Sequence, residues 1–178
     1  MAALIFITGA SSGIGQALAW RYYQAGYTLA LAARRIEEIE SWAQSQALDA
    51  TRYRVYRADV SDVDSIVGAG QACLAELGAP DVVIANAGIS VGMDTGVRGD
   101  LDVMVRTFST NNVGLAATFH PFVRAMELRG SGALVGIGSV AGIRGLPGHG
   151  AYCASKAAVI SYCESLRGEL RNSGAKVV

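Results

Sequence analysis

The residues best suited to catalysis are Ser139, Tyr152 and Lys156. Tyr152 and Lys156 lie four positions apart at the start of a helical pattern, so their side chains share one face of the helix. The phenol of a free tyrosine has a pKa of about 10, which is too high for proton transfer at neutral pH. Because an adjacent ammonium favours the phenolate, this pair indicates acid/base chemistry, with Ser139 hydrogen-bonding the substrate oxygen.

A second group of residues is suited to binding phosphate. The apolar run 4–7 is too short for a helix and leads into a turn with Gly9, Gly13 and Gly15, after which residues 14–25 have a helical pattern. A strand, a glycine turn and a helix N-terminus form an anion site, because backbone N–H groups and the positive end of the helix dipole face the ligand. Glycine is needed where the backbone touches a phosphate. The spacing predicts a variant of the dinucleotide-binding fingerprint.

The end of the second expected strand favours NADP(H) over NAD(H). Dinucleotide folds usually place an acid about 20 residues past the glycines, where it holds the ribose 2′-hydroxyl. Counted from Gly13, that position is Ala33, and Arg34 and Arg35 follow it. Arginine binds a 2′-phosphate through charge-assisted hydrogen bonds, whereas an acid would repel it. The alternative is a pair of solvated charges on a turn.

Further polar residues follow the third and fourth expected strands, as Asp59-Val60 and Asn86-Ala87-Gly88. Asp59 has two possible roles, which the sequence supports about equally. It can accept a hydrogen bond from the adenine amino group, or it can cap the helix that follows.

Strands and helices alternate along the chain and must position these residues. We expect strands at 4–7, 28–33, 53–57, 82–85 and 133–137, with a sixth opening near residue 176, and helices at 14–25, 36–47, 61–77, 101–128 and 151–172. A capping box of Ser61 and Asp64 would open the third helix. This alternation predicts an α/β fold, a doubly wound, Rossmann-type parallel sheet with helices on both faces. Ligands bind such sheets at the carboxyl ends of the strands.

Composition restricts the class of protein. The 178 residues are 51% hydrophobic and 17% charged, which indicates one domain over residues 1–178 with a sizeable core. Lys plus Arg and Asp plus Glu both number 15, which argues against nucleic acid or a charged membrane surface as partner. No apolar run approaches the ~18 residues of a membrane span. Three cysteines without metal-ligand spacing indicate reduced thiols in a cytoplasm and no metal site.

Taken together, the motifs resemble the short-chain dehydrogenase/reductase family. They cover almost the whole chain in the family's order, as Thr8-Gly9-x-x-x-Gly13-Ile14-Gly15, Asn86-Ala87-Gly88, Asn111-x-x-Gly114, Ser139 and Tyr152-x-x-x-Lys156. The resemblance implies an NADP(H)-dependent oxidoreductase that transfers hydride between the nicotinamide and a carbonyl or secondary alcohol.

The resemblance also implies a role for each matching residue. Tyr152 would be the catalytic acid/base, and Lys156 would hold the nicotinamide ribose and make the phenol more acidic. Ser139 would orient the substrate oxygen, and Asn111 would position a water in the proton relay. The residues expected to bind the cofactor are Gly9, Ser11, Ser12, Gly13, Ile14, Gly15, Arg34, Arg35, Asp59, Val60, Asn86, Ala87 and Gly88, together with Tyr152 and Lys156.

Assembly and location are implied in the same way. Family members are mostly cytosolic dimers or tetramers, so we expect a cytoplasmic homodimer or homotetramer acting on a small molecule. The expected helices 101–128 and 151–172 carry more apolar residues than one buried stripe requires, and we expect them to form an isologous interface. The stripe of Leu101, Met104, Val105 and Phe108 belongs to the core or to that interface.

Three departures from the family pattern bear on these expectations. Ala85 stands where many relatives carry a further asparagine, and Ser12 stands where NADP-specific relatives are often basic, so the preference for NADP rests on Arg34 and Arg35. The sequence also stops at Val178, in the opening of a strand. We therefore expect a longer working polypeptide, with a C-terminal portion that orders when ligand binds.

Two other classes of function would leave different marks in the sequence. An NADP-binding sensor, or an inactive truncated relative, would typically have lost part of the tetrad Asn111, Ser139, Tyr152 and Lys156, which is complete here. A serine hydrolase would need Gly-x-Ser-x-Gly around Ser139. The flanking positions are instead Ile137 and Ala141.

Overall fold

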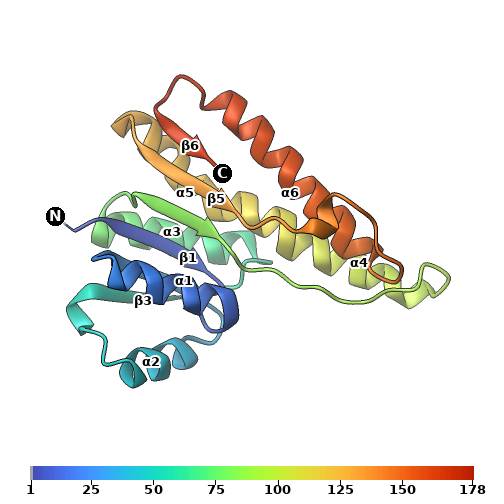
Figure 1. The fold of residues 1–178 in the computed structure, drawn as a ribbon, viewed down its shortest axis with the longest axis horizontal. Coiled ribbons are helices and arrows are strands. Elements are labelled where there is room, and N and C mark those ends of the chain that lie inside the picture. The colour runs from blue at the N-terminus through green and yellow to red at the C-terminus, as the bar shows by residue number, and fades with distance from the viewer. Residues whose placement is uncertain (1) are drawn as a thin grey trace.

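The computed structural model describes residues 2–178 and contains a six-stranded parallel sheet in the order β3-β2-β1-β4-β5-β6 (Figure 1). The chain begins in the middle of the sheet, moves outward to β3 and returns to β4 on the other side of β1. The strand order therefore reverses between β1 and β4, which is the point where such sheets bind ligands. The strands are β1 (Leu4–Thr8), β2 (Thr28–Ala33), β3 (Tyr53–Arg57), β4 (Val82–Ala85), β5 (Gly132–Gly136) and β6 (Ala175–Val177).

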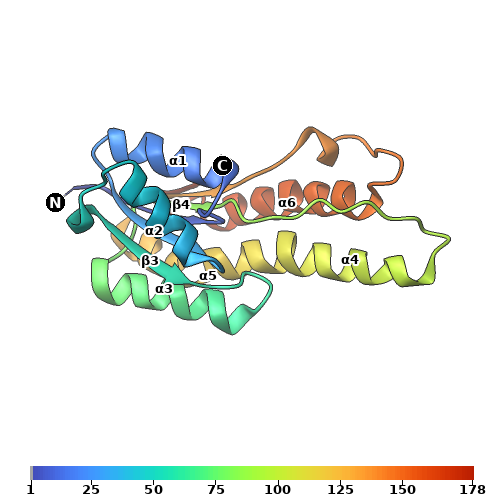
Figure 2. The same ribbon diagram turned by 90° about the horizontal axis from the view of Figure 1, so that it is seen from below.

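Helices cover both faces of this sheet, as predicted (Figures 1 and 2). α1 and α2 pack on one face, and α3, α5 and α6 pack on the other. The α-helices are α1 (Gly13–Gln24), α2 (Ile36–Ser45), α3 (Val63–Leu77), α4 (Leu101–Phe108), α5 (Gly114–Arg129) and α6 (Gly150–Glu169). The short helices are η1 (Ala50–Arg52), η2 (Arg98–Asp100), the π-helical η3 (Ser109–Val113) and η4 (Val140–Gly142).

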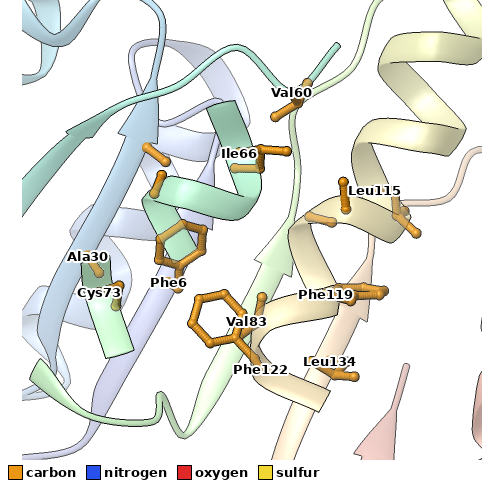
Figure 3. Close-up of a cluster of buried hydrophobic side chains, with 14 of the residues drawn as sticks. Phe6, Ala30, Val60, Ile66, Cys73, Val83, Leu115, Phe119, Phe122 and Leu134 are labelled. Carbon is orange, nitrogen blue, oxygen red and sulfur yellow. The ribbon is translucent and has the colours of Figure 1, made fainter. Parts of the chain in front are cut away.

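The period-2 alternation of the central strand produces a core on each face. Leu4 and Phe6 of β1 point toward α3 and α5, where the rings of Phe6 and Phe122 lie 4.9 Å apart (Figure 3). Ile5 and Ile7 point to the opposite face and pack with residues of α1 and α2. Successive side chains of a strand face opposite sides of the sheet. A continuous apolar run is therefore typical of a strand buried on both faces.

Most element boundaries agree with the prediction to within three residues, and two of the differences have a clear physical reason. The capping box of Ser61 and Asp64 is wrong: the Asp62 carboxylate caps α3 by accepting from the Ser65 N–H at 3.1 Å. The Ser61 hydroxyl instead donates to the Asp59 carboxylate at 2.7 Å. α2 ends at Ser45 rather than at residue 47, since Ala47 adopts the left-handed conformation with φ of +51°.

The helix expected over residues 101–128 has an internal irregularity. α4 continues through the π-helical η3 into α5, so the backbone widens at Ser109–Val113. π-helical turns occur mostly as single insertions inside α-helices and are frequent at functional sites. Asn111 is the buried residue of this turn.

The apolar stripe on α4 lies at the surface. Leu101, Met104 and Val105 are 41%, 38% and 66% exposed, so the core assignment is wrong for these three residues, while Phe108 is half-buried. Among residues 2–178, every helix falls short of the length and apolar character that crossing a bilayer requires. The same residues contain no cluster of three metal-ligating side chains.

Candidate active site

The ends of β1 and β4 are tied together by side chains of Thr8 and Asn86. The buried Thr8 hydroxyl accepts the backbone N–H groups of Asn86 and Ala87, at 3.1 and 3.2 Å. The Asn86 amide donates in return to the Thr8 carbonyl at 3.0 Å. These contacts fix the glycine turn against the loop after β4. Asn86 therefore acts on the turn itself, in addition to lining the space beside it.

Two glycines of the turn meet different demands. Gly13, with φ of +55°, has no atom within 4 Å of the position that a Cβ would occupy, so this glycine faces open space. A Cβ on the buried Gly15 would lie 2.3 Å from the Gly9 carbonyl oxygen and 2.7 Å from Asn86 Nδ2. Gly13 thus provides the left-handed backbone conformation of the turn and leaves the space beside it open. Gly15 instead allows α1 to pack directly under the turn.

A cavity of about 660 Å³ opens beside this turn, at the carboxyl ends of the strands. Its volume lies within the range typical of cofactor sites. Most residues that were predicted to bind the cofactor line it, namely Gly9, Ser11, Ser12, Gly13, Ile14, Arg34, Arg35, Asp59, Val60, Asn86, Ala87 and Gly88. Gly15, Tyr152 and Lys156 lie outside this lining. A glycine cradle with a cavity of this size fits a dinucleotide.

Both predicted arginines of the β2–α2 turn line the cavity and have weak partners. Arg34 lies 3.8 Å from the Asp59 carboxylate, and Arg35 lies 3.0 Å from the carboxylate of Glu38. The Arg34 side chain is 71% exposed. Exposed ion pairs of this kind contribute little to stability. Both guanidinium groups are therefore available to an anionic ligand.

Asp59 is held by its own turn rather than by a helix. One carboxylate oxygen accepts the N–H and the hydroxyl of Ser61, at 2.9 and 2.7 Å. Partial burial raises the pKa of Asp59, but the hydrogen bonds from Ser61 and the charge of Arg34 outweigh this effect, so its pKa lies below the ordinary value. The alternative role as a helix cap is wrong because Asp62 caps α3.

Lys156 lies buried beside Tyr152 on the face of α6 that meets the end of β5. Its ammonium donates to the Ile137 carbonyl at 2.6 Å and lies 5.9 Å from the centre of the Tyr152 ring. Burial lowers the pKa of Lys156, because the charged form loses hydration. Tyr152 is half-buried. The i, i+4 spacing thus brings the two side chains together as predicted.

Ser139 begins the η4 turn, which packs against α6. The Ser139 hydroxyl oxygen accepts the Ala141 N–H at 3.2 Å, which leaves the hydroxyl hydrogen for another acceptor. Close packing of the turn depends on Gly142, where a Cβ would lie 2.9 Å from the Lys156 carbonyl oxygen. The serine turn and the lysine helix therefore hold each other in place.

Asn111 has a structural use for its side chain. Its amide oxygen accepts the Ile89 N–H at 2.8 Å, and its amide nitrogen donates to the Ile89 carbonyl and to Ser155 Oγ, each at 2.9 Å. The side chain is buried and holds the loop after β4 against α6. Any water in a proton relay would therefore need other groups besides this amide.

Gly88 joins the cavity to the catalytic residues. It lines the cavity, and a Cβ there would lie 3.2 Å from Asn111 Oδ1 and 3.8 Å from Lys156 Nζ. Two members of the predicted tetrad, Asn111 and Lys156, therefore lie beside the predicted cofactor residues at the end of β4.

Some lining residues were not predicted from the sequence. Arg106 and Thr110 line the cavity from α4 and η3, opposite the strand ends. Their i, i+4 spacing just before Asn111 was the available signal. The remaining additions are Ala32, Ala33, Ala58, Ser61, Ile89 and Val91.

Comparison with known proteins agrees with this arrangement. A family model described as short chain dehydrogenase matches residues 3–178. The chain is 36% identical to an uncharacterized oxidoreductase of Myxococcus xanthus, covering 96% of the chain and 67% of that protein. It is 32% identical to the NADP-dependent 3-hydroxy acid dehydrogenase of Schizosaccharomyces pombe, covering 98% and 68%.

Solved structures give the same result. The crystal structure of a short-chain dehydrogenase from Streptomyces avermitilis superposes with a TM-score of 0.91 at 30% identity, covering 100% of this chain and 64% of that one. The chain spans from 50% to 67% of the length of several curated relatives that it matches.

Proposed function

The chain belongs to the short-chain dehydrogenase/reductase family, and we propose that it works as an NADP(H)-dependent oxidoreductase on a carbonyl or secondary alcohol. The observation that carries the proposal is the contact region at Gly88. There the glycine-lined cavity adjoins Lys156, which is paired with Tyr152 on one face of α6.

The preference for NADP(H) is supported by the charge at the end of β2. Arg34 and Arg35 line the cavity where an NAD-binding protein would place an acid. A relative with 32% identity is named as NADP-dependent. The two guanidinium groups would hold the 2′-phosphate, and the N-terminus of α1 with Gly13 would hold the pyrophosphate.

The chemistry divides between the cofactor and the chain. When bound, NADP(H) supplies or accepts the hydride. The Tyr152 phenol gives a proton to the carbonyl oxygen during reduction or takes one from the alcohol during oxidation. The Lys156 ammonium stabilises the phenolate. The Ser139 hydroxyl, whose hydrogen is not used by its own turn, donates to the same substrate oxygen.

Replacing Tyr152 with Phe tests the proposal. Hydride transfer, followed as the absorbance of NADPH at 340 nm over a panel of ketones and aldehydes, should fall to background. The Kd for NADPH should remain nearly unchanged, because the phenol acts on the substrate. Lys156→Ala should impair both, since the ammonium serves the cofactor ribose and the tyrosine.

Measurements of folding distinguish the loss of a catalytic group in Tyr152→Phe from damage to the fold. Far-ultraviolet circular dichroism and the unfolding midpoint of Tyr152→Phe should match those of the unaltered protein. Substantial turnover by this variant would show that Tyr152 is not the acid/base.

A further inference from the structure

Arg106 lines the cavity that the residues following β3 also bound. A Cβ on Gly114 would lie 2.5 Å from the Val60 carbonyl oxygen, so the start of α5 touches the residues that follow β3. Thr110 is one helical turn before Gly114, and Arg106 is one turn before Thr110. Both residues line the cavity. Arg106 therefore lines the same cavity as the Asp59–Ser61 segment.

Arg106 differs from the other two arginines at this cavity in its lack of a nearby carboxylate partner. Arg34 and Arg35 each have a carboxylate within 4 Å. Within residues 2–178, the Arg106 side chain forms neither an ion pair within 4.0 Å nor a hydrogen bond. The hydrogen bond between Arg106 and Thr110 is accepted at 3.0 Å by the backbone carbonyl of Arg106 and does not involve its guanidinium. Arg106 thus adds an uncompensated positive group to the cavity.

The lining of this cavity beyond the glycine turn suits a flat, aromatic base. Ala58, Val60, Ile89 and Val91 supply apolar walls, and Asp59 adds a carboxylate at the edge. A planar guanidinium stacks on aromatic faces and on nucleobases. A phosphate, by contrast, would meet few N–H donors between these apolar side chains. The local chemistry therefore favours a purine over a second phosphate.

We propose that Arg106 stacks on the adenine ring of the dinucleotide and closes the adenosine end of the cavity. This assignment rests on the proposed function, because it presupposes a dinucleotide in the cavity. It adds an adenine-binding residue to the phosphate-binding groups of the turn and of β2.

The test measures binding of two fragments by isothermal titration calorimetry. Adenosine 2′,5′-bisphosphate reports the adenosine half of the site, and inorganic pyrophosphate reports the glycine turn. In Arg106→Met the Kd for the bisphosphate should rise about three- to thirtyfold, the range of a cation–π contact, and the Kd for pyrophosphate should stay the same. Arg106→Lys should restore only part of the loss, because lysine lacks the planar group.

Arg124→Met is the matched control, since Arg124 lies exposed on α5 and does not line the cavity. It should bind both fragments as the unaltered protein does. An unchanged Kd for the bisphosphate in Arg106→Met would overturn the assignment. An equal loss for both fragments would overturn it as well, by making Arg106 a phosphate ligand. If the unaltered protein binds neither NADPH nor the bisphosphate, the proposed function itself fails.

Discussion

At the scale of single residues, discrimination between the two nicotinamide cofactors depends on Arg34 and Arg35. Arg34→Ala should narrow the difference in binding free energy between NADPH and NADH by roughly 1.5–3 kcal/mol, the range for hydrogen bonds to charged groups. Stability should hardly change, because the ion pair with Asp59 is exposed and 3.8 Å long. Fluorescence titration with both cofactors gives the four Kd values.

Arg124→Ala provides the control for this measurement, since it removes an exposed arginine far from the cavity lining. Equal affinities for NADPH and NADH in the unaltered protein would contradict the role given to Arg34 and Arg35.

Gly15 illustrates how a residue can serve the site without lining it. In Gly15→Ala the new methyl group would meet the Gly9 carbonyl, which is backbone and cannot rotate away. Such overpacking costs about 1–3 kcal/mol, and the displaced turn should also weaken NADPH binding. Urea unfolding and cofactor titration measure the two effects. A fully stable variant with normal cofactor affinity would show that α1 can shift at no cost.

At the scale of elements, the contact of α3 with α5 depends on a missing side chain. A Cβ on Gly70 would lie 2.6 Å from Pro121 Cγ, within a rigid ring. Gly70→Ala should therefore lower the free energy of unfolding by about 1–3 kcal/mol. Gly68, in the same helix, has no atom within 4 Å of its Cβ position. Gly68→Ala should raise stability by about 0.5–1 kcal/mol, because alanine loses less backbone entropy.

Urea unfolding of Gly70→Ala and Gly68→Ala tests the predicted decrease and the predicted increase in the free energy of unfolding. The pair shares one helix and one chemical change, so only the packing differs between them. Stabilisation of equal size in both variants would mean that helix propensity, rather than contact with α5, governs this region.

The π-helical turn shows how an element can be shaped for a site. Asn111 lies in this turn, and its side-chain amide forms hydrogen bonds with Ile89 and Ser155. It therefore joins the loop after β4 to α6. The loop carries Gly88 and the helix carries Lys156, the two residues at which the cavity and the tetrad meet. The turn therefore supports the geometry of the site through its hydrogen bonds.

At the scale of the whole molecule, the exposed apolar residues of α4 and α6 predict assembly. Leu101, Met104 and Val105 of α4 and Ile160 and Tyr162 of α6 are between 37% and 66% exposed. The two helices run side by side at one end of the molecule (Figure 2). We expect an isologous homodimer through this surface. Light scattering at micromolar concentration should report twice the chain mass of 18.5 kDa.

Val105→Asp should shift the equilibrium between monomer and dimer toward the monomer, because the new carboxylate would be buried at the interface. Val63→Asp is the matched control, since Val63 is 45% exposed on α3, outside the helices expected to form the interface. A monomer in the unaltered protein would contradict the prediction.

The sequence by itself determined the elements and the general location of the site. Apolar runs such as that of β1, and the spacing of Gly9, Gly13 and Gly15, are local patterns, so they could be recognised without knowing the fold. The pairing of Tyr152 with Lys156 is also local, because four residues make one helical turn. Parallel strands then bring their carboxyl ends to one edge of the sheet.

Only the tertiary structure decided how individual side chains are used. The sequence suggested Asp59, or a capping box of Ser61 and Asp64, as the cap of α3, and the path of the chain after β3 assigned that role to Asp62. The side-chain amide of Asn111 binds Ile89, 22 residues earlier in the chain, and no pattern in the sequence indicates this contact. Arg106, which no motif in the sequence indicated, lines the cavity together with residues remote from it in the chain. These uses depend on distances between segments remote in the chain, and no local pattern encodes such distances.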